Sequence, residues 1–346
     1  MLPHNINNNL KNLLKDIFFV VGSNTPYKLA DFLRVLLDAA EHQDFVNNTC
    51  NRLSGPTGET VFSRLQDTNF DKIFVAFSLF LNKTFFLLKN KLRNRKVKLA
   101  FDITEEPVYG EIIGVWMHPN KPVRGSTGCF KFLTVSIVGQ QERLILGSLP
   151  VRRGDDIPKL VEKLLDLAEK HLITDELLFD RGFDSYYLID VLKQRRKKYL
   201  LLWRKQEFQK KILAEMKFGD TKEVVIERKY KMNFSSHKVI IRYVFIKRKH
   251  IDDYDWVFVT NTKKKYLIQI YKQRWGIETI FRVLDNVQIK TTTKNEVIRY
   301  FINIFCCALY NLWKIEVISN VKISLKNFVC KFVTEIERIA LRKGIT

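Results

Sequence analysis

Three carboxylates stand out in this 346-residue chain because of the residues around them. Asp102 follows the apolar run VKLAF and Asp180 follows ELLF, so both are predicted at the ends of buried strands. Glu278 lies in the predicted helix YKQRWGIETIFRVLD, where a rotation of about 100° per residue places Tyr271 and Arg274 on the same face. Carboxylates without motif-spaced histidines are typical ligands of Mg²⁺ or Mn²⁺. Two such ions can promote hydrolysis and transfer of phosphodiesters.

Each of these signals also has a purely structural interpretation. An Asp at the end of a strand often caps a turn through its side chain. An Arg–Glu pair four residues apart on a helix is commonly a surface salt bridge. A bound metal ion would explain a cluster of carboxylates, because without a cation they would repel one another. Taken singly, the residues leave both interpretations open.

The hydrophobic pattern predicts the elements that would position the carboxylates. Residues 1–97 are predicted to be helical, whereas strands and helices alternate further along the chain. This order indicates a mixed α/β layer. The predicted strands are 97–104, 111–118, 129–139, 143–151, 176–180, 198–203, 223–229, 238–247 and 255–260, and the helices among and after them are 156–171, 186–195, 207–218, 264–286, 295–315 and 325–342.

The charge of the chain indicates a polyanionic partner. Lys and Arg number 59 against 37 Asp and Glu, which gives a net charge of +22 and a pI near 9.7. This excess favours nucleic acid as the partner, with an ordinary solvated basic surface as the alternative. The run KNKLRNRKVK (89–98), which includes Arg95, carries six basic residues and no acid. Further along, Lys205 follows Trp203, whose ring could either stack on an unpaired base or pack in the core.

Cysteine content and hydropathy restrict the compartment. The five cysteines form no Cys-x-x-Cys pair, which argues against a disulfide framework or a cysteine-based zinc site. The longest apolar run, 300–313, is shorter than the ~18 residues of a membrane span. We therefore expect a protein of a reducing compartment that does not cross a membrane.

Four stretches of the sequence, in this order, carry a resemblance to a known family. They are FDITEEPVYGE (101–111), LLFDRGFDS (177–185), WVFVTN (256–261) and YKQRWGIETIFRVL (271–284). With them the sequence resembles the DDE transposases of bacterial and archaeal insertion sequences, within the superfamily marked by a Tyr-x2-Arg-x3-Glu signature. The resemblance runs from about Val97 to Trp313, and the pattern FDxTxxPxYG is similar to the archaeal branch in particular.

The resemblance implies a role for each residue that matches the signature. Asp102, Asp180 and Glu278 match the metal-binding and catalytic triad, which implies Mg²⁺ or Mn²⁺ as cofactor, as two ions. Tyr271 and Arg274 match the helix residues that hold phosphate near the cleaved DNA end.

One position departs from the signature. A Lys is expected seven residues after the Glu, and this chain has Asp285 there. Arg282 or Lys290 would then have to supply the phosphate contact that the Lys makes in the family. Arg282, on the helix that carries the Glu, is our candidate for DNA binding.

The resemblance also implies a domain organisation. Residues 98–203 and 262–320 would form a ribonuclease-H-like mixed-sheet catalytic core of the α/β class. A β-rich insertion at 204–261 would sit over the active site. Residues 1–97 would form a helical domain that helps to bind DNA, and 321–346 would add a C-terminal helix.

The activity implied is that of a DNA transposase. It would cut DNA at the ends of an insertion sequence in a metal-dependent step and transfer the resulting 3′-hydroxyl to target DNA, with a hairpin intermediate possible in this superfamily. Its partners would be double-stranded DNA, as terminal inverted repeats and as target, and a second copy of the chain in a homodimer. Its location would be the prokaryotic cytoplasm, at the nucleoid.

Two other functions are compatible with the same residues. A decayed or repurposed transposase would bind DNA without cutting it; the three intact acids argue against this, whereas Asp285 favours it. A metal-dependent host nuclease would share the fold but gives no reason for the Tyr-Arg-Glu helix. Metal-dependent cleavage separates the first function from an active enzyme, and strand joining separates the second from a transposase.

Overall fold

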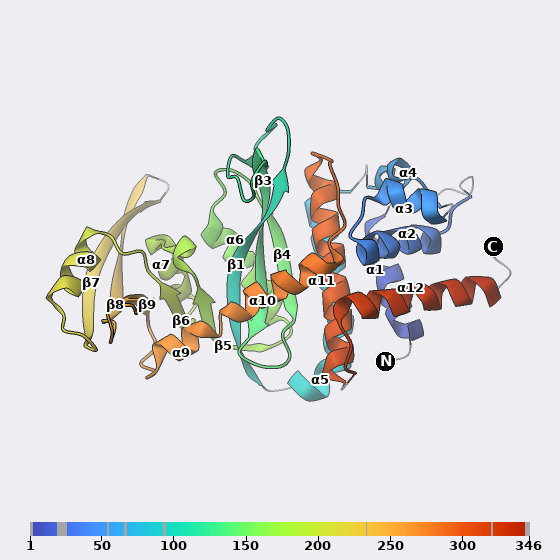
Figure 1. The fold of residues 1–346 in the computed structure, drawn as a ribbon. Helices are drawn as coiled ribbons and strands as arrows, with labels where there is room; N and C mark the ends of the chain where they lie inside the picture. Colours follow the sequence, from blue (N-terminus) through green and yellow to red (C-terminus); the bar gives the residue numbers. More distant parts are fainter. Residues whose placement is uncertain are drawn as a thin grey trace.

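A nine-stranded mixed sheet forms the centre of the protein (Figure 1). The structure is a computed structural model. It describes residues 3–18, 26–53, 55–65, 68–92, 95–232, 234–319 and 321–342. The strands are β1 (Lys96–Val108), β2 (Met117–His118), β3 (Gly128–Val138), β4 (Ile145–Val151), β5 (Ile173–Phe179), β6 (Tyr199–Leu202), β7 (Thr221–Met232), β8 (Ser235–Ile246) and β9 (Trp256–Thr260).

The order of strands is β2-β3-β1-β5-β6-β9-β8-β7, and β4 also pairs with β3. β1 is antiparallel to β3 and parallel to β5, and β5 is parallel to β6. The remaining pairs are antiparallel. Central strands such as β6 are buried along their whole length, as expected where both faces of a sheet are covered. The mixed sheet agrees with the ribonuclease-H-like core expected from the sequence.

Helices surround this sheet and form a separate layer at one end of the molecule (Figure 1). α6 packs on β3 and β4, α10 crosses β1 and β3, and α5 and α11 lie against β4. The helices are α1 (Pro3–Ile17), α2 (Leu29–His42), α3 (Val46–Leu53), α4 (Gly58–Ser63), α5 (Phe70–Leu92), α6 (Ile157–Glu169), α7 (Tyr186–Gln194), α8 (Glu207–Glu215), α9 (Leu267–Lys272), α10 (Trp275–Leu284), α11 (Glu296–Ile318) and α12 (Leu325–Arg342), with short 3₁₀ turns η1 (Arg181–Phe183) and η2 (Asp285–Val287).

The last helix of the chain packs on the first ones. α12 lies against α2 and α1, so both ends of the described chain contribute to the helical layer, at the right of Figure 1. The apolar face of α12, with Val329 fully buried, meets the hydrophobic core of this layer. The N-terminal part is helical as the sequence predicts, and it is completed by a helix from the other end of the chain.

α11 connects the helical layer to the sheet, and it is the helix in the described part of the chain that is long and apolar enough to cross a membrane. The sequence predicts this helix at 295–315, and its uncharged apolar run, 300–313, is shorter than a membrane span. The helix extends beyond 300–313 because the Asn295 side chain caps its first turn, accepting from the amides of Val297 and Ile298. Since 78% of its most apolar window is buried within the fold, α11 is a core helix.

Two predicted strands differ from the observed ones. Only Met117–His118 of the predicted strand 111–118 pairs with the sheet, because Gly110 and Gly114 adopt positive φ angles of 79° and 69° that interrupt an extended chain. β1 in turn continues to Val108, so Asp102 lies within the strand and not at its end.

Two further predictions are changed by the tertiary structure. The predicted helix 264–286 is interrupted: α9 and α10 are separated by a tight turn at Gln273 and Arg274. The β-rich segment 204–261 does not form a sheet of its own, because β9 pairs with β6 and β8 pairs with β9. The central sheet therefore continues through this segment without a break.

Candidate active site

Asp102 and Asp180 lie side by side on neighbouring strands. Phe101 of β1 is the register partner of Phe179 of the parallel strand β5, and each Asp directly follows one of these residues. The two Phe rings stack 5.0 Å apart on one face of the sheet. Because side chains alternate between faces, both carboxylates turn toward the opposite face, which α9 and α10 cover.

The turn between α9 and α10 carries a guanidinium to these acids. Arg274 is only 6% exposed, and its Nη1 donates to Asp102 Oδ2 over 3.1 Å while its Nη2 donates to Glu278 Oε1. The interruption of the helix comes from amide-to-carbonyl bonds across three residues, including Arg274 to Tyr271 at 2.8 Å. Glu278 keeps 47% of its side chain exposed, so the Arg–Glu pair lies where a buried guanidinium meets the surface, and the bond from Arg274 to Asp102 joins the start of α10 to β1.

Tyr271 is buried beneath Arg274. Its ring packs against Phe258 and Trp256, and it is 2% exposed. Burial raises the pKa of Tyr271 to about 12, with Asp180 and Asp102 adding to the effect and Arg274 opposing it. The phenol therefore stays protonated at neutral pH and supports the guanidinium from below.

The pKa of Asp102 depends on the charges of the other two acids. Burial raises the pKa of Asp102 to about 6; Arg274 lowers it, and Asp180 and Glu278 raise it again. Burial alone would lower the pKa of Arg274, but Tyr271 and the carboxylates of all three acids raise it above its ordinary value. The structure thus brings Asp102, Asp180 and Glu278 into one electrostatic site around one guanidinium.

Asp180 also has the capping role considered from the sequence. Its Oδ1 accepts a 2.7 Å hydrogen bond from the amide of Gly182, at the start of η1. A Cβ at Gly182 would lie 2.9 Å from that oxygen, so a larger residue there would disturb the turn. A capped carboxylate keeps its second oxygen for another partner, and its direction is fixed by the turn.

The donor set fits a hard divalent ion, because Asp102, Asp180 and Glu278 offer only carboxylate oxygens. The oxygens of these three acids lie further apart than the ligands of a bound ion. Among the described residues, a group of three candidate ligands within 4.8 Å of one another occurs at Asp38, Glu41 and His42. That group lies in α2, and Arg52 of α3 pairs with its Asp38 over 2.7 Å. At the site itself, the Arg274 guanidinium stands between Asp102 and Glu278 as their counter-ion.

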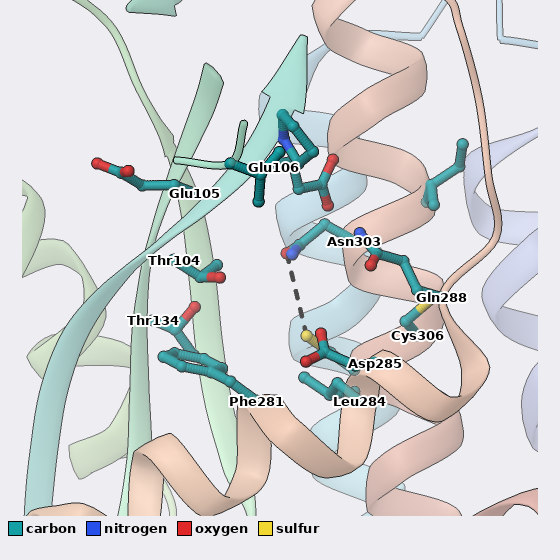
Figure 2. Close-up of a pocket in the computed structure, with 14 residues that line it drawn as sticks. Thr104, Glu105, Glu106, Thr134, Phe281, Leu284, Asp285, Gln288, Asn303 and Cys306 are labelled. Atoms are coloured by element: carbon teal, nitrogen blue, oxygen red, sulfur yellow. Dashed lines mark hydrogen bonds between the residues drawn. The ribbon is translucent and has the colours of Figure 1, made fainter. Parts of the chain in front are cut away.

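A cavity of about 340 Å³ lies further along β1, between this strand and the end of α10 (Figure 2). The exposed residue Asp285 lines it at the end of α10, and partial burial of its carboxyl group raises the pKa of Asp285. Figure 2 shows Glu106 and Asp285 on opposite sides of the cavity, with Asn303 of α11 between them. Where the signature has a Lys, this chain therefore adds a carboxylate to a pocket that already contains Glu105 and Glu106.

For Glu105 and Glu106 the sequence favours solvated loop acids, with extra metal ligands as the alternative, but both lie within β1 and Glu106 is buried. It is 7% exposed, and Arg299 of α11 pairs with it at 3.7 Å. Burial raises the pKa of Glu106 to about 7, against the opposing effect of Arg299. The available signal was the alternation of Asp102, Thr104 and Glu106 along one face of a strand, which requires β1 to continue past its predicted end.

Two of the predicted DNA-binding residues are engaged inside the fold. Trp203 is 3% exposed, stacks on Tyr186 and meets Tyr243 edge-on. Base stacking by Trp203 is therefore excluded in this structure, and its core alternative is correct. Lys205 donates to the carbonyl of Asp255 over 3.1 Å, and its ammonium lies 3.7 Å from the centre of the Tyr254 ring.

The other predicted DNA-binding residues lie at the surface. Arg95 pairs with Glu142 at 3.2 Å and keeps 57% of its side chain exposed. Arg282 is exposed on α10. Of the basic run 89–98, Arg93 and Asn94 lie outside the described residues.

Comparisons with known proteins identify the family and the fold. Residues 119–312 match the family model described as transposase DDE domain. Among solved structures, the chain is similar to a piggyBac transposase in a cryo-EM synaptic complex with hairpin DNA, with a TM-score of 0.62 and 12% identity over 99% of this chain and 81% of the other. At that identity the likeness concerns the fold. No curated protein matches the sequence significantly.

Proposed function

The chain belongs to the transposase DDE domain family and has the activity class of a DDE-type DNA transposase, and from this premise we propose that Asp102, Asp180 and Glu278 are its catalytic carboxylates. The observation that carries the proposal is the register of β1 and β5. It sets two acids from distant segments next to each other, facing the helix that supplies the third. Arg274, in contact with two of the three, links the strand to that helix.

Enzymes of this family generally use divalent metal ions, and the three carboxylates are the residues that would hold them here. Such ions, as Mg²⁺ or Mn²⁺ and two in number, would favour attack on a phosphodiester and offset its negative charge. The chain's own contribution is to hold the acids on rigid elements and to keep Arg274 in reach of a phosphate oxygen. A guanidinium can bind phosphate through two parallel hydrogen bonds, which suits Arg274 to the DNA end once it releases a carboxylate.

The proposed substrate is double-stranded DNA that carries the terminal inverted repeats of an insertion sequence, followed by target DNA. The net charge of +22 supports a polyanionic substrate. Metal ions held by the acids at the centre of the sheet would contact the phosphates of that substrate. The similar piggyBac structure is a synaptic complex with hairpin DNA, which supports a hairpin route for this chain also. We further propose a homodimer on DNA, a bacterial or archaeal insertion sequence as the source, and the cytoplasm as location, which the five free cysteines support.

Asp285 supports the second candidate function, a repurposed or decayed transposase that binds DNA without cutting it. A carboxylate in the cavity beside the triad repels phosphate where the signature offers an ammonium. The two functions are separated by incubating the protein with DNA that carries its terminal repeats and Mg²⁺ or Mn²⁺. Cleavage at the repeat ends identifies the enzyme, whereas binding without cleavage identifies the repurposed protein.

A further inference from the structure

A second, basic groove lies at the N-terminal end of α10, whereas the cavity of Figure 2 lies at its C-terminal end. The groove is an open depression of about 780 Å³ between the turn from β3 to β4, the first residues of α10 and the last turn of α11. Its rim carries three cations from three different elements: Arg143, Lys272 and Lys314. None of the described residues that line it is acidic.

The cations of this groove repel one another. Burial lowers the pKa of Lys314, and the charge of Arg143 lowers it further, whereas the charge of Glu142 raises it. Glu142, the nearest acid in sequence, is paired with Arg95 at 3.2 Å. Like charges gathered without a carboxylate in the lining are stabilised when an anion binds between them.

The groove also offers a flat aromatic surface. Trp275 is 47% exposed at its edge, and the ammonium of Lys272 lies 5.8 Å from the centre of that ring. A ligand with phosphates and planar rings would satisfy cations and indole together, and nucleic acid is such a ligand.

The groove lies next to the residues of the candidate active site. Gln273 and Trp275, which line it, are the chain neighbours of Arg274, and Thr279 follows Glu278. A Cβ at Gly276 would lie 3.7 Å from Nε of Arg143, so the start of α10 and the basic rim are in contact. A DNA backbone in the groove would therefore continue directly from the phosphate that Arg274 is proposed to hold.

We propose that the groove formed by Arg143, Lys272, Trp275 and Lys314 binds the DNA backbone next to the bond that is cut, and so extends the candidate active site. The identity of the polyanion rests on the proposed function; the groove itself rests on its charges and its exposed indole. Contacts there position the duplex relative to Asp102 and carry no sequence information of their own.

The first test measures binding of end-containing duplex over a series of salt concentrations. Replacing Arg143, Lys272 and Lys314 together with Gln should weaken binding and reduce the slope of log affinity against log salt by up to about three units, one per lost phosphate contact. The matched control replaces Lys159, Lys163 and Lys170 with Gln, which removes the same charge from α6 on the other face of the sheet. Equal slopes for the two triple variants would overturn the proposal.

The second test locates the DNA and does not depend on the stability of a triple variant. A photo-cross-linking residue, p-benzoylphenylalanine, in place of the exposed Trp275 should cross-link to the duplex at the cleaved end. A cross-link spread evenly along the duplex, or none, contradicts the proposal. Asp102→Asn serves as the separate control for the function: it should bind DNA and not cut it. If Asp102→Asn cuts at the wild-type rate, the proposed function fails whatever the groove does.

Discussion

The Arg274 guanidinium donates to Asp102 Oδ2 over 3.1 Å, across 172 positions of sequence. It simultaneously donates to Glu278, one turn further along α10. One side chain thus ties the helix that carries the third acid to the strand that carries the first. The arrangement also means that Arg274 neutralises the carboxylates when no other cation is near them.

Arg274→Lys tests this link. An ammonium cannot reach both acids with the fixed fork of a guanidinium, so we expect cleavage to fall by about 10²–10³-fold. Loss of a largely buried partner should also lower the free energy of unfolding by about 1–3 kcal/mol. Arg282→Lys, on the exposed side of the same helix, is the matched control and should change stability little. Equal cleavage rates for the two variants would show that Arg274 has no special role.

Trp203→Ala tests the assignment of this indole to the core. Removing a ring that stacks on Tyr186 should lower the free energy of unfolding by about 3–5 kcal/mol, and Trp203→Phe by less. DNA affinity per folded molecule should stay at the wild-type value, because the ring is 3% exposed. Denaturant unfolding and DNA titration on the same samples make the comparison. A variant with normal stability and weakened DNA binding would restore the base-stacking role.

Glu106 should make stability depend on pH. Its carboxyl group ionises near pH 4.5 in the unfolded chain and near pH 7 in the folded one, because it is buried. Between these values the folded state holds the proton more tightly, so stability is greatest below about pH 4.5 and falls as pH rises to 7, by up to about 3 kcal/mol. Glu106→Gln should flatten this part of the profile, measured by denaturant unfolding. An unchanged slope in the variant would assign the pH dependence to other groups.

Asp285→Lys restores the charge that the signature has at this position. It removes one carboxylate from the cavity of Figure 2 and adds a cation to the same cavity, so DNA-end affinity should rise. The slope of log affinity against log salt should steepen by about one unit if the new ammonium contacts a phosphate. Asp285→Asn, which removes charge without adding any, should lie between the two proteins. Identical slopes for all three would mean that this cavity does not face DNA.

Much of the fold was predictable because long amphipathic and apolar runs decide it locally. The helix at α6 and the buried runs of β5 and β6 were predicted within a few residues. The failures came where backbone conformation or distant pairing decides. Gly110 and Gly114 break a run that composition alone predicts to be a strand. The pairing of β9 with β6 joins segments that no local pattern connects.

The acids of the candidate site were predictable for a different reason. Asp102 and Asp180 each follow a buried apolar run, and strand register then sets them side by side. The interruption of the helix at Arg274 and the burial of Tyr271 were not predictable, because both depend on packing against β6 and β9. Glu106 was expected to be a solvated loop acid, because its burial depends on α11 and on Arg299 opposite it.

The most direct measurement of the central claim compares cleavage and binding in Asp102→Asn, Asp180→Asn and Glu278→Gln. Each variant removes one negative charge and keeps the size of the side chain, so the fold and DNA-end binding should persist, with affinity equal or slightly tighter in a gel-shift assay. Cleavage of end-containing DNA with Mg²⁺ or Mn²⁺ should fall by several orders of magnitude in all three, since each would lack one ligand of the ions. A Glu278→Gln protein that binds DNA and cuts it at the wild-type rate would contradict the account.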